Sequence, residues 1–90
     1  MIPLLESLLS KVEPEYSEEA RSLKMQGTVL LKIVVDTDGV AKNIQLVSGQ
    51  GHGLDEKAAT AIGLWKFKPG ERGGVPVPVM AQIEVNFRLM

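Results

Sequence analysis

The glycine tract Ser48-Gly49-Gln50-Gly51-His52-Gly53 is the stretch whose residue types and spacing could do chemistry. Three alternating glycines could let a backbone approach a phosphate. The pattern, however, is G-x-G-x-G rather than G-x-G-x-x-G, and the lysine and hydroxyl of a P-loop are missing. Asp55 follows the tract, and its negative charge would repel a phosphate from the helix start expected there. We therefore interpret the tract as a flexible connector.

Other candidates for catalysis are isolated side chains. His52 is the sole histidine and has no nucleophile or second metal ligand near it in the sequence. The chain has no cysteine, which excludes a disulfide framework and a thiolate metal site. An acylphosphatase-like enzyme would need an arginine in an anion-binding loop, and neither Arg21, Arg72 nor Arg88 lies in the glycine tract. The sequence therefore predicts no catalytic residues, no cofactor and no metal site.

Length and charge restrict the class of protein further. A chain of 90 residues is long enough for one domain with a modest core. The net charge of -1, with acids and bases interspersed, gives no basic surface for nucleic acid or an anionic membrane. Residues 1–9 are apolar-rich but are interrupted by Pro3, Glu6 and Ser7, and they are too short for a membrane helix. We expect a linker remnant at residues 1–10 and one domain at 11–90.

Two helices are predicted, and one of them follows the glycine tract. The longer one begins near Asp55, expected as its N-cap, and ends before Pro69. Its inward stripe is Ala58, Ala61, Ile62 and Trp65. Trp65 and Phe67 have strand-like spacing, which predicts that the helix unwinds there and delivers both rings to the core. A shorter helix is expected over residues 17–25, capped by Ser17, with Ala20, Leu23 and Met25 facing inward.

Three strands are predicted from alternation of apolar and polar residues. Residues 28–36 place Val29, Leu31, Ile33 and Val35 on one face. The turn Asp36-Thr37-Asp38-Gly39 leads to a return strand at residues 40–48, with Val40, Ile44 and Leu46 on one side. After a polar turn at residues 71–74, residues 75–90 are expected to form one long strand. The order of elements predicts an α+β domain: a three-stranded antiparallel sheet of order two, one, three, with both helices on one face.

The last strand is predicted to be an edge strand. Pro76 and Pro78 lie at positions whose N–H groups would point to the same side, so this side lacks two donors and cannot be an internal ladder there. The odd-numbered backbone groups are then expected to pair inward, and the even-numbered groups from Met80 to Arg88 to face outward. An open edge of this length is a candidate docking site.

Residues at many positions along the chain match the pattern of a known protein family. The chain resembles the C-terminal domain of TonB-family energy transducers over roughly residues 12–90. The matching positions are Tyr16, Ala20, Gly27, Asp38-Gly39, Leu54-Asp55, Ala58, Ala61, Trp65, Phe67, Pro69, Gly74, Pro76, Phe87 and Leu89. Ser17 departs from the family, which usually has proline after the tyrosine; serine caps helices well, so the fold is expected to survive.

The resemblance implies a non-enzymatic periplasmic domain. It would bind the N-terminal peptide motif of an outer-membrane TonB-dependent transporter by β-strand addition, so that inner-membrane energy reaches outer-membrane transport. Its membrane anchor would lie in a part of the protein absent from this sequence. The expected partner-binding residues are Glu13, Pro14, Glu15 and Tyr16, beside the peptide, and Met80, Gln82, Glu84, Asn86 and Arg88, on the last strand.

Two alternatives stay open. One is a TonB-like module appended to another envelope protein, such as a sensor peptidase, or a domain of a TolA-like system. The other is a self-associating domain, in which the last strand pairs with a second copy or is covered by residues 1–9.

Overall fold

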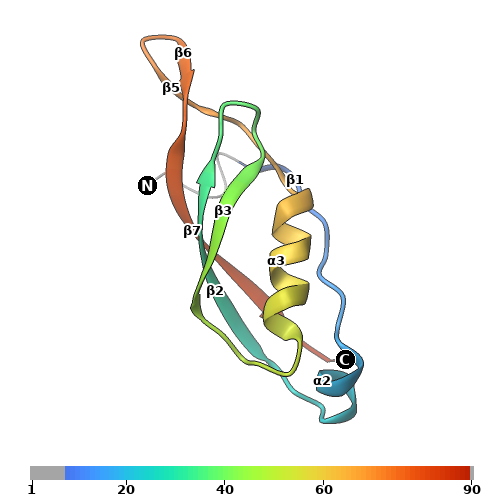
Figure 1. The fold of residues 1–90 in the computed structure, drawn as a ribbon. Coiled ribbons are helices and arrows are strands. Elements are labelled where there is room, and N and C mark those ends of the chain that lie inside the picture. Colours follow the sequence, from blue (N-terminus) through green and yellow to red (C-terminus); the bar gives the residue numbers. More distant parts are fainter. Residues whose placement is uncertain (1–7, 90) are drawn as a thin grey trace.

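The computed structural model describes residues 8–89, and its arrangement is shown in Figure 1. The elements are β1 (Leu8–Ser10), α2 (Glu18–Ser22), β2 (Gly27–Val35), β3 (Ala41–Ser48), α3 (Leu54–Leu64), β4 (Lys66–Phe67), β5 (Gly70–Arg72), β6 (Val75–Val77) and β7 (Val79–Phe87). The main sheet is antiparallel, with strand order β3-β2-β7. The predicted α+β class and the predicted strand order are therefore confirmed.

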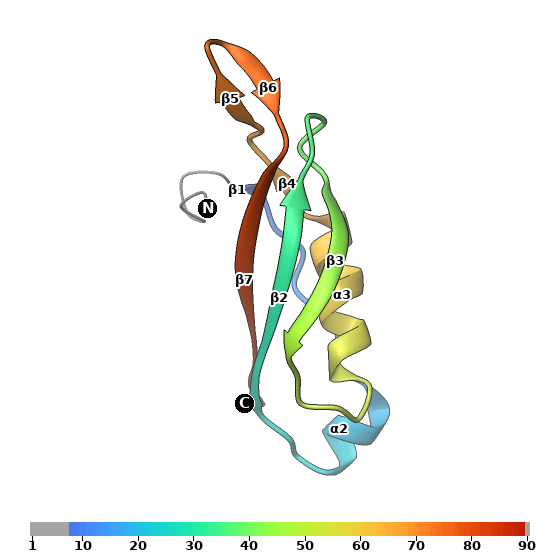
Figure 2. The ribbon, with the colours of Figure 1, turned by 60° about the vertical axis from the view of Figure 1, so that its left-hand side comes forward.

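The core lies between the sheet and α3. The odd-numbered side chains from Val29 to Val35 in β2 and from Ala81 to Phe87 in β7 are buried, whereas the even-numbered side chains of β7 are exposed. Figure 2 shows α3 along one face of the sheet and α2 at the end of the molecule. Small residues on α3 let it lie close to the strands, and Ala58 and Ala61 are both buried. The inward stripe predicted for this helix is correct.

The end of α3 behaves as the spacing of its aromatic residues predicts. Trp65 is the C-cap residue with an extended backbone, and Phe67 follows in β4. Both side chains are buried, and their ring centroids lie 6.2 Å apart. Breaking the helix at Trp65 switches the side-chain period from helical to alternating, so both rings enter the same core.

The short helix α2 is capped as expected. The Ser17 hydroxyl accepts a hydrogen bond from the Ala20 amide at 3.1 Å, and Ala20 is buried. Lys24 then adopts a positive φ of 55°, which ends the helical turn. Leu23 is the C-cap residue of α2 and is 57% exposed, so the inward orientation predicted for it is wrong.

The predicted N-cap of α3 is also wrong. Gly53, with φ 84°, occupies the cap position. The Asp55 carboxylate instead accepts hydrogen bonds from the Gln50 amide at 2.9 Å and the Gly51 amide at 3.1 Å. These bonds satisfy donors of the glycine tract, so Asp55 shapes the connector rather than the helix end.

The β2–β3 turn is built as the sequence predicts. Gly39 has φ 77°, and a Cβ there would collide with the Phe67 carbonyl. The Asp38 carboxylate accepts a hydrogen bond from the Val40 amide at 3.0 Å and lies 3.3 Å from the Lys42 ammonium. The Val40 bond first, and Lys42 next, hold the pKa of Asp38 below the ordinary aspartate value.

The single strand expected at residues 75–90 is wrong. β6 pairs with β5 in a separate hairpin, whose turn contains Gly73 and Gly74, both at positive φ. Pro78 separates β6 from β7 and has no N–H for a ladder. Figure 2 shows the β5–β6 hairpin projecting beyond the end of the main sheet.

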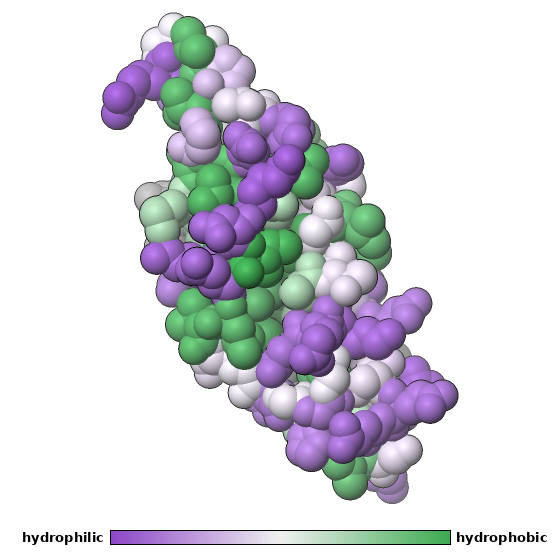
Figure 3. Space-filling model, viewed as in Figure 1, coloured by the Kyte–Doolittle hydropathy of each residue, from purple (hydrophilic) through white to green (hydrophobic). Residues whose placement is uncertain are grey.

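The pairing of the return strand β3 with β2 has register shifts between Leu30 and Leu31 and between Lys32 and Val34. Leu46 lies opposite the buried Leu31, so it points to the same face of the sheet, but on this edge strand Leu46 and Val47 are 53% and 49% exposed. Figure 3 shows apolar side chains gathered on the face that carries β3.

Candidate functional site

The sheet has two edges of different regularity. β3 carries two irregularities in its pairing with β2, and Asn43 has a positive φ of 50°. β7 pairs with β2 without a break, from Gly27 opposite Phe87 to Val35 opposite Val79. Bulges disrupt the ladder and discourage strand pairing at an edge. The regular β7 edge is therefore the one suited to accept another strand.

The outward groups of β7 can be assigned from bonds at the ends of the sheet. The Asp36 amide donates to the Val40 carbonyl at 3.1 Å, so it points away from β7. Because backbone groups alternate along a strand, Val35 and the other odd-numbered residues of β2 point toward β7. Their partners in β7 are also odd-numbered. The N–H and C=O groups of the even-numbered residues therefore face outward, as predicted.

A second bond agrees with this assignment. The Leu89 amide, just past β7, donates to the Gln26 side-chain oxygen at 3.0 Å, on the β2 side. Within residues 8–89, β7 pairs with β2 alone. The outward ladder thus comprises the main-chain groups of Met80, Gln82, Glu84 and Asn86.

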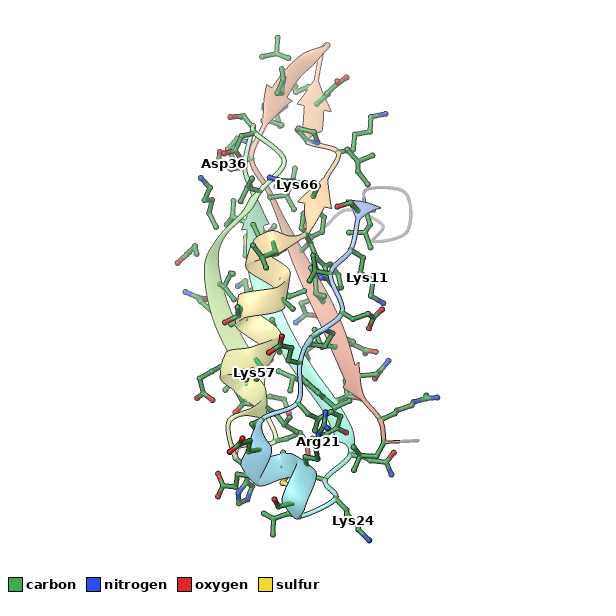
Figure 4. All side chains as sticks on the ribbon, turned by 90° about the vertical axis from the view of Figure 1, so that its right-hand side faces the viewer. Lys11, Arg21, Lys24, Asp36, Lys57 and Lys66 are labelled. Carbon is green, nitrogen blue, oxygen red and sulfur yellow. The ribbon has the colours of Figure 1, made fainter. Side chains whose placement is uncertain are left out.

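An extended segment, residues 11–16, runs close to this edge. Figure 4 shows it passing from Lys11 between α3 and β7. Two aromatic residues anchor it: the Trp65 indole N–H donates to the Val12 carbonyl at 2.8 Å, and the Tyr16 hydroxyl donates to the Met25 carbonyl at 2.8 Å. The Tyr16 ring also meets the Phe87 ring edge-on, with centroids 5.4 Å apart.

The segment and the edge enclose a hollow of about 70 Å³. Residues from both parts of the predicted partner-binding set, the segment before α2 and the last strand, meet here. The hollow is lined by Lys11, Glu13, Pro14, Trp65, Glu84, Val85 and Asn86. Lys11 lies 3.5 Å from the Glu13 carboxylate and 5.6 Å from the centre of the Trp65 ring. A second hollow, of about 200 Å³, separates the segment from α3.

The other predicted site residues lie outside the hollow beside β7. Met80 and Gln82 are exposed further along the strand, and Arg88 lies just beyond its end. Glu15 faces α3, where Lys57 lies 3.6 Å from its carboxylate. Tyr16 is held by the core contacts above and anchors the segment.

The sequence analysis missed three residues of the hollow. Trp65 was interpreted as structural only, whereas its ring also forms a wall of the hollow, and Lys11 and Val85 were not assigned to the site. The separation of Trp65 from the last strand in sequence hides this neighbourhood, which arises only when segment, helix end and strand pack together.

The part of the first segment that the structure describes does not cover the β7 edge. Leu8–Ser10 pairs with β4 instead. Whether residues 1–7 cover the edge lies outside the described residues. The linker boundary expected at residue 10 stays a prediction. Among the described helices, none is long and apolar enough to cross a membrane.

Comparison with known proteins gives consistent matches. Residues 12–89 match the family model for the Gram-negative bacterial TonB protein C-terminal region. Protein TonB of Vibrio cholerae is 38% identical over 81 residues, which are 89% of this chain and 33% of that protein. Protein TonB of Escherichia coli is 31% identical over 77 residues, or 83% of this chain and 32% of that protein. This chain thus spans about a third of the length of these relatives.

A solved structure shares the fold. The solution NMR structure of the Pseudomonas aeruginosa TonB CTD superposes with a TM-score of 0.74 and 24% sequence identity, covering 91% of this chain and 84% of that one. At this identity the match supports the fold alone.

Proposed function

Because the chain belongs to the family of Gram-negative bacterial TonB C-terminal domains, we propose that it is a non-enzymatic domain that binds an outer-membrane transporter's N-terminal peptide motif by β-strand addition. The peptide would pair with the β7 edge in the periplasm. The rest of a longer protein would anchor the domain in the inner membrane and couple energy to transport.

The open, regular edge of β7 is the observation that carries this proposal. Four residues present outward main-chain groups at alternating positions, and the pairing of β7 with β2 is unbroken behind them. A strand added here would gain hydrogen bonds along its backbone, which give affinity with little dependence on sequence. The segment at residues 11–16 would lie beside it and contact alternate side chains.

The expected affinity is moderate. A short peptide loses backbone and side-chain freedom when it is ordered on the edge, and it buries a small area. We therefore expect a dissociation constant on the order of micromolar for a peptide of about five to eight residues. Each tenfold change in this constant corresponds to about 1.4 kcal/mol of binding free energy.

The first experiment tests the backbone pairing without altering the protein. A peptide carrying a transporter's motif is N-methylated at one backbone position at a time, and binding is followed by titration calorimetry. Methylation removes a donor, so positions facing β7 should lose binding, whereas positions facing away should keep it. Alternation with a period of two along the peptide supports strand addition, and uniform sensitivity contradicts it.

The second experiment tests the edge itself. Gln82→Pro removes an outward donor while sparing the pairing with β2, and edges tolerate proline, so the variant should fold and lose binding. Gln82→Ala is the matched control and should weaken binding only modestly, because the ladder is main-chain. If the amide shifts caused by the peptide map to Gly49–Gly53 and leave residues 80–88 unchanged, the proposed docking edge is wrong.

A further inference from the structure

We propose that a second hollow at the end of the β7 edge, on the open face of the sheet, binds a carboxylate of the docked peptide. This inference rests on the proposed function. The hollow lies where β2 begins and β7 ends, and we call it the amide hollow. It measures about 300 Å³ and is lined by Gln26, Gly27, Thr28, Asn86, Phe87 and Arg88.

The register of the sheet places the polar side chains of the amide hollow. Thr28 lies opposite Asn86, and Figure 2 shows the start of β2 beside the end of β7. The even-numbered side chains of β7 are exposed, on the face that α3 does not cover. Because paired residues direct their side chains to the same face, Thr28 and Asn86 meet on this open face. Arg88 follows Asn86 by two residues and lines the same hollow.

Two hydrogen bonds orient the amide groups so that they present donors. The Thr28 hydroxyl donates to the Asn86 side-chain oxygen at 2.7 Å. The Leu89 amide donates to the Gln26 side-chain oxygen at 3.0 Å. Because each oxygen is bound within the protein, the NH₂ group is the end of each side chain that is left for a ligand.

Arg88 supplies the positive charge of the amide hollow. Its guanidinium group has only donors, arranged in a planar fork that matches the two oxygens of a carboxylate. Within residues 8–89, none of the ion pairs engages Arg88. The residues that line the hollow include no acid. One cation and two donor amides suit a single carboxylate better than a phosphate dianion, whose second charge would stay uncompensated.

The position of the hollow on the docking edge identifies the peptide residue concerned. Asn86 is the last of the four residues whose main-chain groups face outward. A peptide residue aligned with Asn86 directs its side chain to the same open face, whichever way the peptide runs. Aligned residues on neighbouring strands have Cβ atoms about 5 Å apart. An aspartate or glutamate at this position can therefore reach the Asn86 amide and the Arg88 fork.

The experiment is an aspartate scan of the peptide. A peptide carrying a transporter's motif, with both ends blocked, has Asp or Asn at each position in turn, and binding is measured by titration calorimetry at low salt. Nuclear Overhauser contacts to Asn86 identify the aligned position. There we expect Asp to bind about fivefold more tightly than Asn, near the upper limit for exposed ion pairs. Asp aligned with Glu84, two residues away on the same face, should give no gain, because that carboxylate repels it.

Protein variants test whether Arg88 is responsible. Arg88→Gln removes the charge and should reduce the preference for Asp to below about twofold. Arg88→Lys keeps the charge without the fork and should give an intermediate preference. Lys32→Gln is the matched control, because Lys32 lies opposite Gln82 and carries an equal charge on the same face, further along the sheet. It should leave the preference intact.

Two readouts report on the contact itself. The Nε–Hε resonance of Arg88 should shift more with the Asp peptide than with the Asn peptide, because only the carboxylate pairs with the fork. The preference for Asp should also fall when salt is raised to about 0.5 M, since exposed charges are then screened.

The outcomes separate this inference from the proposed function. If no peptide binds, the docking edge is wrong and the subsite fails with it. If the peptides bind but Asp and Asn are equal at every position, the docking edge stands and the subsite is wrong. A preference for Asp that survives Arg88→Gln also overturns the subsite, because the attraction then comes from another part of the protein.

Discussion

Trp65 links the core to the segment beside the proposed docking edge, so its truncation tests both. Only 3% of its surface is exposed, and its indole N–H donates to the Val12 carbonyl. Truncation of a buried aromatic residue to alanine usually costs about 3–5 kcal/mol, because contacts are lost and a cavity is left. We expect this cost for Trp65→Ala, which is a large share of the roughly 5–15 kcal/mol that stabilises a typical domain.

A conservative variant separates the two contributions. Trp65→Phe keeps a ring in the core but removes the donor, so it should cost about 1–2 kcal/mol, near the net value of one hydrogen bond plus a small packing loss. Both variants are measured by urea denaturation followed by far-ultraviolet circular dichroism. Thermal melts should show a fall of at least about 12 °C for Trp65→Ala, since 1 kcal/mol corresponds to about 4–8 °C in a domain of this size.

Hydrogen exchange completes the test of Trp65. The amides of the segment should exchange faster in both variants, because its carbonyl anchor is lost. If Trp65→Ala costs less than about 1 kcal/mol and the exchange is unchanged, the indole stabilises neither the core nor the segment, and the anchoring role assigned to its bond with the Val12 carbonyl is refuted.

Three further predictions concern other parts of the molecule. Gly39→Ala should cost more than about 1 kcal/mol by urea denaturation, because a Cβ meets backbone there, whereas Gly51→Ala, also at positive φ but in open space, should cost less; equal costs contradict this. The pKa of Asp38 is lowered in the folded protein, so ionised Asp38 stabilises the fold at pH values above the ordinary aspartate pKa. This stabilisation is lost as the pH falls through the pKa of Asp38 in the folded protein. An NMR titration midpoint for Asp38 at or above the ordinary aspartate pKa would contradict this prediction. The open β7 edge should give concentration-dependent dimers in sedimentation experiments, and Gln82→Pro should make the protein monomeric; a parent that is monomeric at all concentrations would show that the edge does not self-pair.

The sequence by itself determined the elements whose signals are local. Alternation fixed the inward face of β2, and the residues Asp36–Gly39 fixed the hairpin turn. The spacing of Trp65 and Phe67 revealed the end of α3. Each signal involves residues that are close together in the sequence, where side-chain periodicity and backbone preference determine the local structure.

Tertiary structure alone decided which hydrogen bonds the polar groups and strands make with distant partners. Asp55 is a residue type that commonly caps helices, but its carboxylate accepts hydrogen bonds from the Gln50 and Gly51 amides of the glycine tract instead. Residues 75–77 have the pattern of the following strand, yet they pair with residues 70–72. The bulges of β3 leave β7 as the regular edge, and the hollow appears where residues 11–14 meet Trp65 and Val85. These features depend on competition between distant partners, and residue periodicity carries no information about which partner wins.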